Sequence, residues 1–561
     1  MQKDKNMIKN YISKYFRFFA FILLFLVVNI SQAQITTWTG SWDNGNPDIT
    51  KDVVFNANYV STVDISAKSV SISNNAIVTI GDGVSAPTFT IQNDITIAAG
   101  SSFVFENNAS LLQTNPLAVN TGNINYKRNT TPIKQFEYTY WSSPVSGQTL
   151  VGFSPNTNYA RFYSFNSAPG VNNWVSETYS NVMSPKGYAI RVPDTYDPNT
   201  PSVFNGEFIG KPNNGDISTN VVAFNPGIKN YNLIGNPYPS AISLISLLDN
   251  SNLGSLYFWT HNTAIAANVF TTNDYAVRTR TTGTAAISGG AAPGLYIAAG
   301  QGFFASAGTT TTLTFTNSMR VGNNNSQFYK NTQTVPLNYY VHLNLTNTSG
   351  AFKQIAFGYE EGATNGYDFG TDALASTEGA ITFYSLISSI SSGFGIQGRE
   401  YPWNVNDVID LGISATIAGD YTIAIDHVNP FFDDKDIFIE DTTLGTYFNL
   451  KTGSYTFTTA IGTFDNRFKI HYVNPLLGNN DFILNANNVI VNTNNNEIEV
   501  NSTSQKIKNI QVYDVLGRLI FNKKDTNENK VSISSIRKQN QALIIKTELE
   551  NNQRVTKKLI F

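Results

Sequence analysis

Short runs in which apolar and polar residues alternate recur through most of the chain, and these runs end at Asn, Gly or Pro. Because the side chains of a β-strand point alternately to the two faces of a sheet, a period of two predicts strands that are buried on one side. Asn and Gly supply the turns between such strands. We therefore expect an all-β protein and, at 561 residues, one with several domains.

Residues 34–121 show this alternation most regularly. The runs "SVSISNNAIVTI", "FTIQNDITIAAG" and "SSFVFENNASLLQ" follow one another at nearly even spacing. Even spacing of short strands is typical of the coils of a parallel β-solenoid. The same pattern also suits one sheet of a β-sandwich, and three runs leave both alternatives open.

The rest of the chain divides into three further predicted β-domains. Residues 122–330 hold aromatic strands separated by Pro, Gly and Asn, and residues 331–476 hold about nine strand-like runs. Both patterns predict β-sandwich or jelly-roll domains. Residues 484–561 contain about seven runs and predict a small Ig-like sandwich. One helix is expected, over 239–250, with Ser240 as its N-cap.

The first 33 residues have the organisation of a secretory signal peptide. Five basic residues precede the eleven apolar residues of "FFAFILLFLVV" (18–28), and the small-residue triplet "SQA" follows. This order predicts cleavage between Ala33 and Gln34. The apolar run is shorter than the ~20 residues that a membrane span needs. We therefore expect a protein that is secreted or held at the cell surface, with no membrane-spanning segment in the mature chain.

Several functional classes are disfavoured by what the sequence lacks. There is no Cys, which excludes disulfides and every Cys-based zinc, haem or nucleophile site. The four His residues (His261, His342, His427 and His471) lie far apart and in no ligand spacing such as HxxxH. Neither GxSxG nor HExxH occurs. We therefore expect no enzyme activity and name no catalytic residue.

The charge of the chain is unevenly distributed. Residues 34–480 carry twenty Lys and Arg against thirty-one Asp and Glu, whereas residues 481–561 carry twelve against eight. A nucleic-acid partner requires a basic face for its phosphates. The acidic main body therefore argues against nucleic acid as a partner.

Two motifs can each be explained either by a function or by the fold alone. "GFGIQG" (393–398) matches a dinucleotide fingerprint, but no βαβ pattern surrounds it, so a glycine-rich hairpin is expected instead. Asp433, Asp434 and Asp436 cluster with other acids in "FFDDKDIFIED" (431–441) and offer the oxygen ligands that calcium prefers. Their spacing differs from that of a calcium-binding helix-loop-helix, so an exposed acidic turn is expected, with a structural calcium ion as the alternative. No other cofactor is expected.

The tryptophans Trp141, Trp174, Trp259 and Trp403 have two explanations. Aromatic planes can stack on the apolar faces of sugars and so form a glycan-binding surface. Large aromatic side chains also fill the cores of β-sandwiches. Both explanations remain open for each residue.

The segment 484–561 resembles a known family. "IQVYDVLGRLIF", then "VSISSI", then "QALIIKTELENNQRVTKKLIF" are similar in order and spacing to the C-terminal sorting domains of proteins exported by the type IX secretion system of Bacteroidota, in the variant called type C. The resemblance implies recognition by an outer-membrane translocon, and attachment to surface polysaccharide is known for some such substrates. The sorting role is carried over to Tyr513, Asp514, Gly517, Arg518, Lys557, Lys558 and Phe561.

The preceding residues resemble large extracellular proteins of the same bacteria. The segments "TYWSSPV", "YNLIGNPYPSAI" and "GTFDNRFKIHYV" are similar to parts of adhesin-like chains for which no enzymatic activity is implied. The expected function is a secreted or surface-displayed, non-catalytic, adhesive or binding protein with an export signal at residues 484–561. The alternative is an extracellular protein that binds or cleaves carbohydrate.

Overall fold

The computed structural model describes ten stretches of the chain: 34–168, 171, 173–225, 230–263, 270–326, 339–474, 489–494, 496–502, 505–550 and 554–561. The predicted signal peptide, with Ala33, lies outside these described residues. The chain forms two compact units, of which the first ends at Ile470 and the second runs from His471 to Phe561. We call them unit 1 and unit 2. Strands make up most of the ordered structure in both, which confirms the all-β, multidomain prediction.

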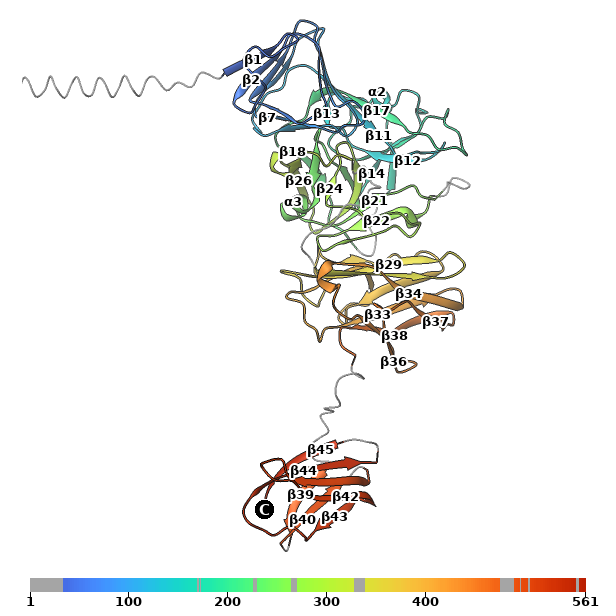
Figure 1. The fold of residues 1–561 in the computed structure, drawn as a ribbon. Coiled ribbons are helices and arrows are strands. Elements are labelled where there is room, and N and C mark those ends of the chain that lie inside the picture. Colours follow the sequence, from blue (N-terminus) through green and yellow to red (C-terminus); the bar gives the residue numbers. More distant parts are fainter. Residues whose placement is uncertain are drawn as a thin grey trace, which may run out of the picture. The chain divides into compact units, whose positions relative to one another are not determined.

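Unit 1 begins with a parallel β-solenoid, drawn in blue in Figure 1. Its strands stack in parallel into three sheets, which decides between the two alternatives left open by the sequence. The first sheet contains β1 (Gln34–Trp38), β2 (Lys51–Phe55), β5 (Ser69–Ile72) and β8 (Ile95–Ile97). The second contains β4 (Ile65–Ala67), β7 (Thr88–Ile91) and β10 (Ser110–Gln113). The third contains β3 (Tyr59–Ser61), β6 (Ile77–Ile80), β9 (Ser102–Phe105) and β11 (Ile124–Asn129).

Aromatic rings stack along the interior of the solenoid. Phe89 and Phe103 lie 5.8 Å apart, Phe103 and Phe105 4.6 Å, and Phe105 and Tyr126 5.8 Å, measured between ring centroids. All four side chains are fully buried. In the strands of each coil, the apolar residues of the alternating pattern thus face the interior and the polar residues face outward.

The solenoid continues into the segment predicted as the next domain. Strand β11 pairs in parallel with β9 and antiparallel with β17 (Asn205–Pro212), which in turn pairs with β13 (Val145–Ser146). One core cluster runs from the solenoid to Phe208 and Ala299. The predicted change of domain at residues 121 and 122 therefore falls inside a continuous sheet and a continuous core.

Four smaller sheets complete the middle of unit 1. One contains β12 (Tyr138–Trp141), β16 (Tyr188–Arg191), β14 (Phe162–Asn166) and β15 (Asn173–Ser176). A second contains β19 (Asn232–Gly235), β25 (Gly302–Ala307), β21 (Leu253–Trp259), β22 (Tyr275–Arg278) and β23 (Gly283–Thr284). The others pair β18 (Ile217–Val221) with β26 (Thr311–Phe315), and β20 (Ala241–Ser243) with β24 (Tyr296–Ile297) and β27 (Arg320–Val321).

The expected helix exists, but its predicted start is wrong. Helix α3 spans Leu244–Asp249, and the side chain of Ser243 caps it by accepting from the Ser246 N–H. Residues 241–243 form β20 instead, because Ile242 pairs with both Ile297 and Arg320. The other helical segments among the described residues are α2 (Leu150–Phe153) and the 3-10 turns η1 (Thr272–Asp274), η2 (Asn317–Met319) and η3 (Pro430–Phe432). Within the described stretches, no helix has the length and apolar composition needed to cross a bilayer.

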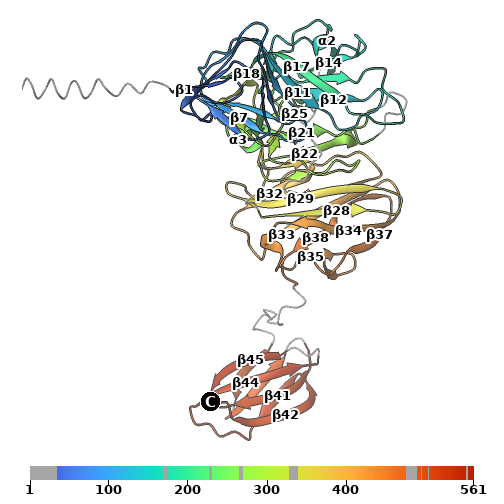
Figure 2. The same ribbon diagram turned by 45° about the horizontal axis from the view of Figure 1, so that its top comes forward.

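Unit 1 ends in a single eleven-stranded sheet, drawn from yellow to orange in Figure 2. The rings of Phe448 and Tyr455, on the two end strands of this sheet, lie 5.8 Å apart between centroids, so the sheet curves around its own core. Its strands are β28 (Tyr339–Thr346), β29 (Phe352–Glu360), β30 (Ala373–Leu374), β31 (Ile381–Leu386), β32 (Gly393–Glu400), β33 (Val408–Ala415), β34 (Gly419–Val428), β35 (Phe438–Asp441), β36 (Thr446–Asn449), β37 (Tyr455–Thr459) and β38 (Gly462–His471).

The "GFGIQG" motif forms the second strand of a β-hairpin in this sheet, as the sequence predicted, because β31 and β32 are consecutive and antiparallel. Strand β32 pairs in parallel with β29 and antiparallel with β31. A Cβ atom on Gly393 would lie 2.3 Å from the Tyr384 ring, and one on Gly412 would lie 2.1 Å from it. The glycines therefore make room for the Tyr384 ring, whose hydroxyl donates to Asp465 at 2.7 Å.

Unit 2 contains all seven strands predicted from its sequence. One sheet consists of β39 (Val489–Asn494), β40 (Glu497–Ser502) and β43 (Lys530–Ile533). The other consists of β42 (Leu519–Glu528), β41 (Ile507–Tyr513), β44 (Ala542–Leu549) and β45 (Arg554–Ile560). Residues of both sheets share one buried core, and Phe561 belongs to it with no exposed surface. The Phe561 N–H donates to the Gln541 carbonyl at 2.9 Å, so the end of this chain is docked in the fold.

Candidate functional site

Three of the predicted sorting residues build one turn of unit 2. The Asp514 carboxylate accepts from the backbone N–H of Leu516 at 3.0 Å and of Arg518 at 2.9 Å, and from the Arg518 guanidinium at 2.7 Å. These contacts hold the pKa of Asp514 below its usual value. Gly517 has a φ of 78°, a conformation that glycine adopts without strain. The turn exposes Val515 and Leu516, whose exposed fractions are 68% and 79%.

The other sorting residues lie on two neighbouring parts of the same sheet. Tyr513 on β41 pairs with Ile544 on β44, which pairs with Lys558 on β45, so the three form one row. The Lys546 ammonium lies 5.1 Å from the centre of the Tyr513 ring. Lys558 is exposed and Lys557 half-buried, whereas Phe561 is in the core. The structure thus groups Asp514, Gly517 and Arg518 in a turn, and places Lys558 in the same cross-strand row as Tyr513, with β44 between them.

The calcium candidates do not come together as a ligand set. The Asp434 carboxylate pairs with the Lys435 ammonium at 2.8 Å. Asp436 accepts from the Asn449 amide at 2.7 Å. Asp433 ends η3, and all three side chains are exposed. Among the described residues, one group of three side chains has its potential metal-ligand atoms close together, and this group contains none of the three aspartates.

The four tryptophans separate into core and surface residues. Trp141 is fully buried, 4.8 Å from the Phe153 ring, and fills the core. Trp174 has an exposed fraction of 42%. Trp259 is half-buried, and its indole N–H has no hydrogen-bond partner in the described structure. Trp403 packs 5.4 Å from the Phe431 ring.

Trp174 and Trp259 belong to a group of touching aromatic rings that spans two sheets. Trp174 and Trp259 both contact Tyr140, at 5.8 Å and 5.9 Å between ring centroids. Tyr140 and Tyr275 hydroxyls lie 2.6 Å apart. We call this group the aromatic face; it comprises Tyr138, Tyr140, Tyr163, Phe165, Trp174, Trp259, Phe270, Tyr275 and Phe304. Trp174 and Phe270 are its most exposed members, at 42% and 46%.

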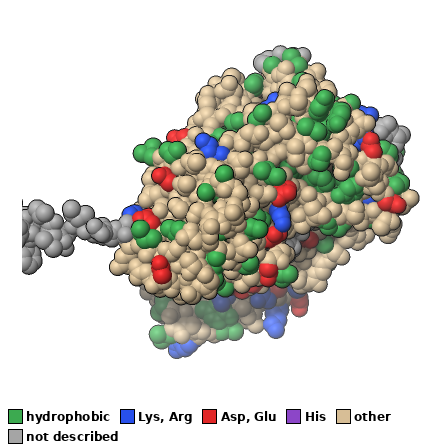
Figure 3. Space-filling view, turned by 90° about the horizontal axis from the view of Figure 1, so that it is seen from above, with side chains coloured by type: hydrophobic (Ala, Val, Ile, Leu, Met, Phe, Trp, Pro, Cys, Tyr) green, Lys and Arg blue, Asp and Glu red, His purple; other side chains and the backbone are tan. Residues whose placement is uncertain are grey.

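The face of the molecule in Figure 3 carries few charged side chains. Figure 3 shows one face on which uncharged polar atoms predominate, hydrophobic side chains gather in patches and charged side chains are scattered. This matches the low share of charged residues in the sequence, 14%. Such a surface suits uncharged partners better than strongly charged ones.

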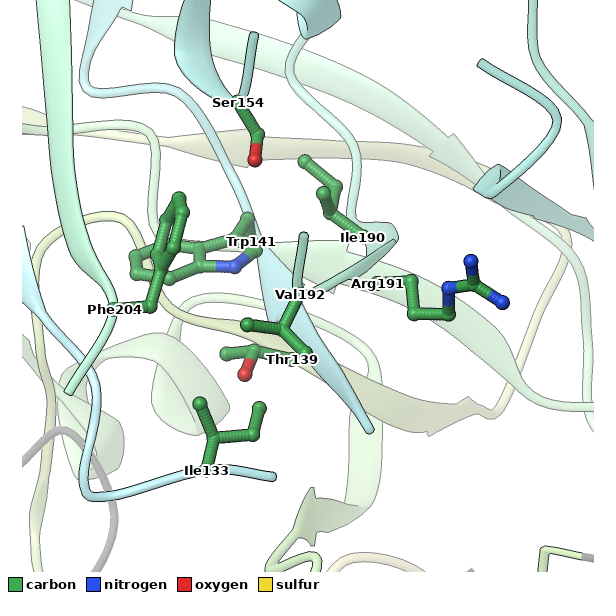
Figure 4. Close-up of a pocket in the computed structure, with 8 residues that line it drawn as sticks. All are labelled: Ile133, Thr139, Trp141, Ser154, Ile190, Arg191, Val192 and Phe204. Carbon is green, nitrogen blue, oxygen red and sulfur yellow. The ribbon is translucent and has the colours of Figure 1, made fainter. Parts of the chain in front are cut away.

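A small pocket lies beside Trp141 (Figure 4). Its walls include Trp141, Phe204, Ile190 and Ser154, and the guanidinium of Arg191 points away from the indole ring. The empty space is about 190 Å³ including its open mouth. Pockets for small molecules usually begin at ~300 Å³. This pocket is therefore a packing gap rather than a ligand site.

The structure also brings together residues that the sequence kept apart. His342 on β28 and Asp426 and His427 on β34 place their ligand atoms within 4.8 Å of one another. The four histidines are far apart in the sequence, whereas the fold brings His342 and His427 together. Spacing along the chain could not reveal the group, because residues 342 and 427 meet only through the pairing of two strands.

Comparison with known proteins divides the chain close to the boundary between the two units. Residues 477–561 match a family model described as a domain of unknown function, DUF8694. A search of curated proteins finds no match. A second family model, described as a domain of unknown function, DUF8693, matches residues 33–472, which are most of the chain. The solenoid, the aromatic face and the eleven-stranded sheet thus lie within one family match, and the chain belongs to the DUF8693 family.

Proposed function

We propose that unit 1 is the binding body of a secreted or cell-surface protein, and that residues 484–561 are its export signal. The observation that carries the export role is that unit 2 is a complete seven-stranded sandwich with its own core, closed by the buried Phe561. A folded tag of this kind can be read by a partner independently of its cargo. The signal-peptide pattern of residues 1–33 and the resemblance to type IX sorting domains support the same proposal.

The partner in export is a type IX translocon, and two features of unit 2 suit such recognition. The turn built by Asp514 and Gly517 exposes two adjacent apolar side chains, Val515 and Leu516. Residues 481–561 are also net basic, in contrast to the acidic body before them. Exposed apolar groups beside charged ones are typical of protein interaction surfaces.

The export role is tested by localisation in a Bacteroidota host with a working type IX system. The full chain and a chain without residues 477–561 are expressed, and an antibody to unit 1 follows the medium, cell surface and periplasm. We expect the truncated chain to stay in the periplasm. The full chain in an isogenic strain without the translocon is the control and should stay there too. Arrival of the truncated chain at the surface would overturn the export role.

For the binding role, the aromatic face supports glycan as the ligand class. Partly exposed rings that touch one another form a hydrophobic platform, and sugars present apolar faces that stack on such rings. Trp174 lies on the edge strand β15 and contacts Tyr140, Phe165 and Phe304 at 5.8, 5.1 and 5.6 Å. Its ring is thus held in place by buried neighbours while one side remains accessible.

The glycan role is tested by binding of the purified full chain to an array of neutral polysaccharides and oligosaccharides. We expect Trp174→Ala to weaken binding by about fivefold or more, since one stacked ring contributes on the order of 1 kcal/mol or more. Tyr159→Ala is a matched control, because Tyr159 is exposed and stacks on Tyr179 outside the aromatic face. Equal loss in both variants, or binding by neither the variants nor the parent chain, would refute the glycan role while leaving the export role untouched.

A further inference from the structure

His342, Asp426 and His427 converge because of an irregularity between two strands. Strands β28 and β34 are antiparallel, with His342 opposite His427 and Leu343 opposite Ile425. Asp426 is therefore an extra residue in β34, which makes this position a β-bulge. Side chains of consecutive strand residues normally point to opposite faces, and a bulge changes the direction of one of them. The Asp426 and His427 side chains accordingly meet, with Oδ2 of Asp426 2.6 Å from Nδ1 of His427.

Two ring nitrogens and one carboxylate oxygen meet in this cluster, and the protons on the two rings cannot give each close contact its own hydrogen bond. Nδ1 of His342 lies 3.3 Å from Nδ1 of His427, which is also the atom that faces the Asp426 carboxylate. Nδ1 of His427 can carry one proton, and that proton would have to serve both neighbours. A neutral imidazole keeps the lone pair of one ring nitrogen, and that lone pair can bind a metal ion.

Further side chains fix the orientation of these three. Nε2 of His342 lies 3.0 Å from the Thr282 hydroxyl, which leaves Nδ1 directed at the cluster. Each oxygen of Asp426 accepts from an amide: Oδ1 from Asn344 at 2.8 Å, and Oδ2 from Gln354 at 3.2 Å. Gln354 is itself held by the Ala285 N–H at 2.8 Å. Supporting hydrogen bonds of this kind orient ligands in metal sites.

The cluster combines a buried side with an open side. His342 is 2% exposed, whereas the side chains of Asp426 and His427 are 39% and 43% exposed. An ion held here would keep coordination positions for water or for an outside ligand. Three protein ligands with open positions distinguish such a site from closed structural sites with four ligands.

We propose that His342, Asp426 and His427 bind a divalent transition-metal ion, with Zn²⁺ as the first choice. Two imidazole nitrogens and one carboxylate oxygen are a ligand set that zinc and its neighbours in the first transition row prefer. Calcium and magnesium prefer sets made of oxygen alone. The ion would replace the shared proton between the two rings and the carboxylate, and would link β28 to β34 at the bulge.

The test is isothermal titration of the purified, chelator-treated full chain with ZnCl₂. We expect one zinc ion per chain, and we expect Asp426→Asn and His427→Asn each to weaken binding at least about a hundredfold, beyond the ~10–100-fold effect of losing a supporting residue. Asp426 and His427 are chosen because they are exposed, so both variants should fold, which circular dichroism checks. Asp410→Asn and His471→Asn are matched controls outside the cluster; Asp410 is an exposed carboxylate on β33 paired with Lys469.

Two further measurements decide the ligand chemistry. Electron paramagnetic resonance of the Cu²⁺-loaded chain should show coupling to two ring nitrogens, and to one nitrogen in His427→Asn. Gln354→Leu should retain one zinc ion per chain but bind it about tenfold more weakly, because Asp426 loses an orienting donor. Zinc binding that is absent, or equally strong in Asp426→Asn and the controls, would overturn the proposal. Equal affinity for CaCl₂ at this site would overturn the assignment to a transition metal.

Discussion

At the scale of single residues, acids that are adjacent in the sequence have different roles in the fold. Asp433, Asp434 and Asp436 are exposed, but Asp441, in the same acidic run, is fully buried. Its carboxylate accepts from the Arg467 guanidinium at 2.9 Å and from the Tyr455 hydroxyl at 3.0 Å. A buried ion pair that is fully hydrogen-bonded holds its strands in register, and it leaves no free oxygen for calcium.

Removal of one partner from this pair should be costly. Arg467→Met leaves the Asp441 charge buried without its partner, which typically lowers the free energy of unfolding by about 3–5 kcal/mol. Lys469 lies on the same strand as Arg467 and forms an exposed ion pair with Asp410. Lys469→Met breaks this pair and should lower the free energy of unfolding by less than about 1 kcal/mol. Urea denaturation of both variants measures the difference. Similar costs for the two would contradict the structural role given to Asp441.

Asp372 should make the stability of unit 1 depend on pH. Burial raises the pKa of Asp372 to about 7, although its carboxylate accepts from the N–H groups of Asp368 and Gly398 at 2.6 Å each. The folded chain then keeps a proton up to about pH 7 that the unfolded chain releases near pH 4. The stability from this proton is complete below about pH 4 and is lost as the pH rises through 7.

The comparison with Asp372→Asn isolates this effect. The side chain of the variant cannot ionise. As the pH rises from 5 to 7, the free energy of unfolding of the parent chain should therefore fall relative to that of the variant, by up to about 1.4 kcal/mol per pH unit. Urea titrations at several pH values provide the measurement, with Asp410→Asn as an exposed control. A difference between parent and Asp372→Asn that stays constant with pH would show that Asp372 ionises normally.

At the scale of elements, the solenoid is stabilised from within rather than by its short strands. Strands of three to six residues form few hydrogen bonds each, while the aromatic stack from Phe89 to Tyr126 runs through several coils. The antiparallel strand β17 then covers the end of the third sheet. The third sheet thus continues into a paired strand instead of ending at an open edge, which would invite association with other chains.

The aromatic stack should therefore carry a large part of the stability of unit 1. Phe103→Ala removes a fully buried ring that contacts Phe89 and Phe105, and should lower the free energy of unfolding by about 3–5 kcal/mol. Ile77→Ala on the adjacent strand β6 is the matched control, because Ile77 faces outward with 47% exposure. Ile77→Ala should lower the free energy of unfolding by about 0.5 kcal/mol. Thermal and urea unfolding distinguish the two.

At the scale of the whole molecule, the chain combines two units that differ in core and charge. Among the described residues, the buried core cluster of unit 2 consists only of residues between Val489 and Phe561. Acidic residues are in excess in 34–480 and basic residues in 481–561. Each unit can therefore keep its fold while the other is disrupted.

This independence leads to a further prediction. Ile510→Asp places a charge in the core of unit 2, where Ile510 is fully buried, and should remove the unfolding transition of unit 2 while leaving that of unit 1 unchanged. Ile490→Asp, on the exposed side of β39, should preserve both transitions. Differential scanning calorimetry measures them. If Ile510→Asp also shifts the transition of unit 1, the two units unfold cooperatively and the tag is not independent.

Much of the fold could be predicted because its signals are local. Alternation of apolar and polar residues with Asn and Gly turns determines that this chain forms strands, and all seven strands of unit 2 were predicted on that basis. The buried side of β45 followed from the same alternation: Phe561 is inside and Ile560 is 68% exposed. The signal peptide, the export role and the glycan ligand remain predictions.

Only the tertiary structure decided which strands meet. Helix α3 starts later than predicted because Ile242 pairs with residues 297 and 320 as part of a strand. The hairpin strand that contains "GFGIQG" also pairs in parallel with β29, a strand that is distant in the sequence. Such choices depend on packing between distant segments, which local periodicity does not encode. The His342, Asp426 and His427 cluster has the same origin: a bulge and the register between β28 and β34 bring it together, over a separation of 85 residues.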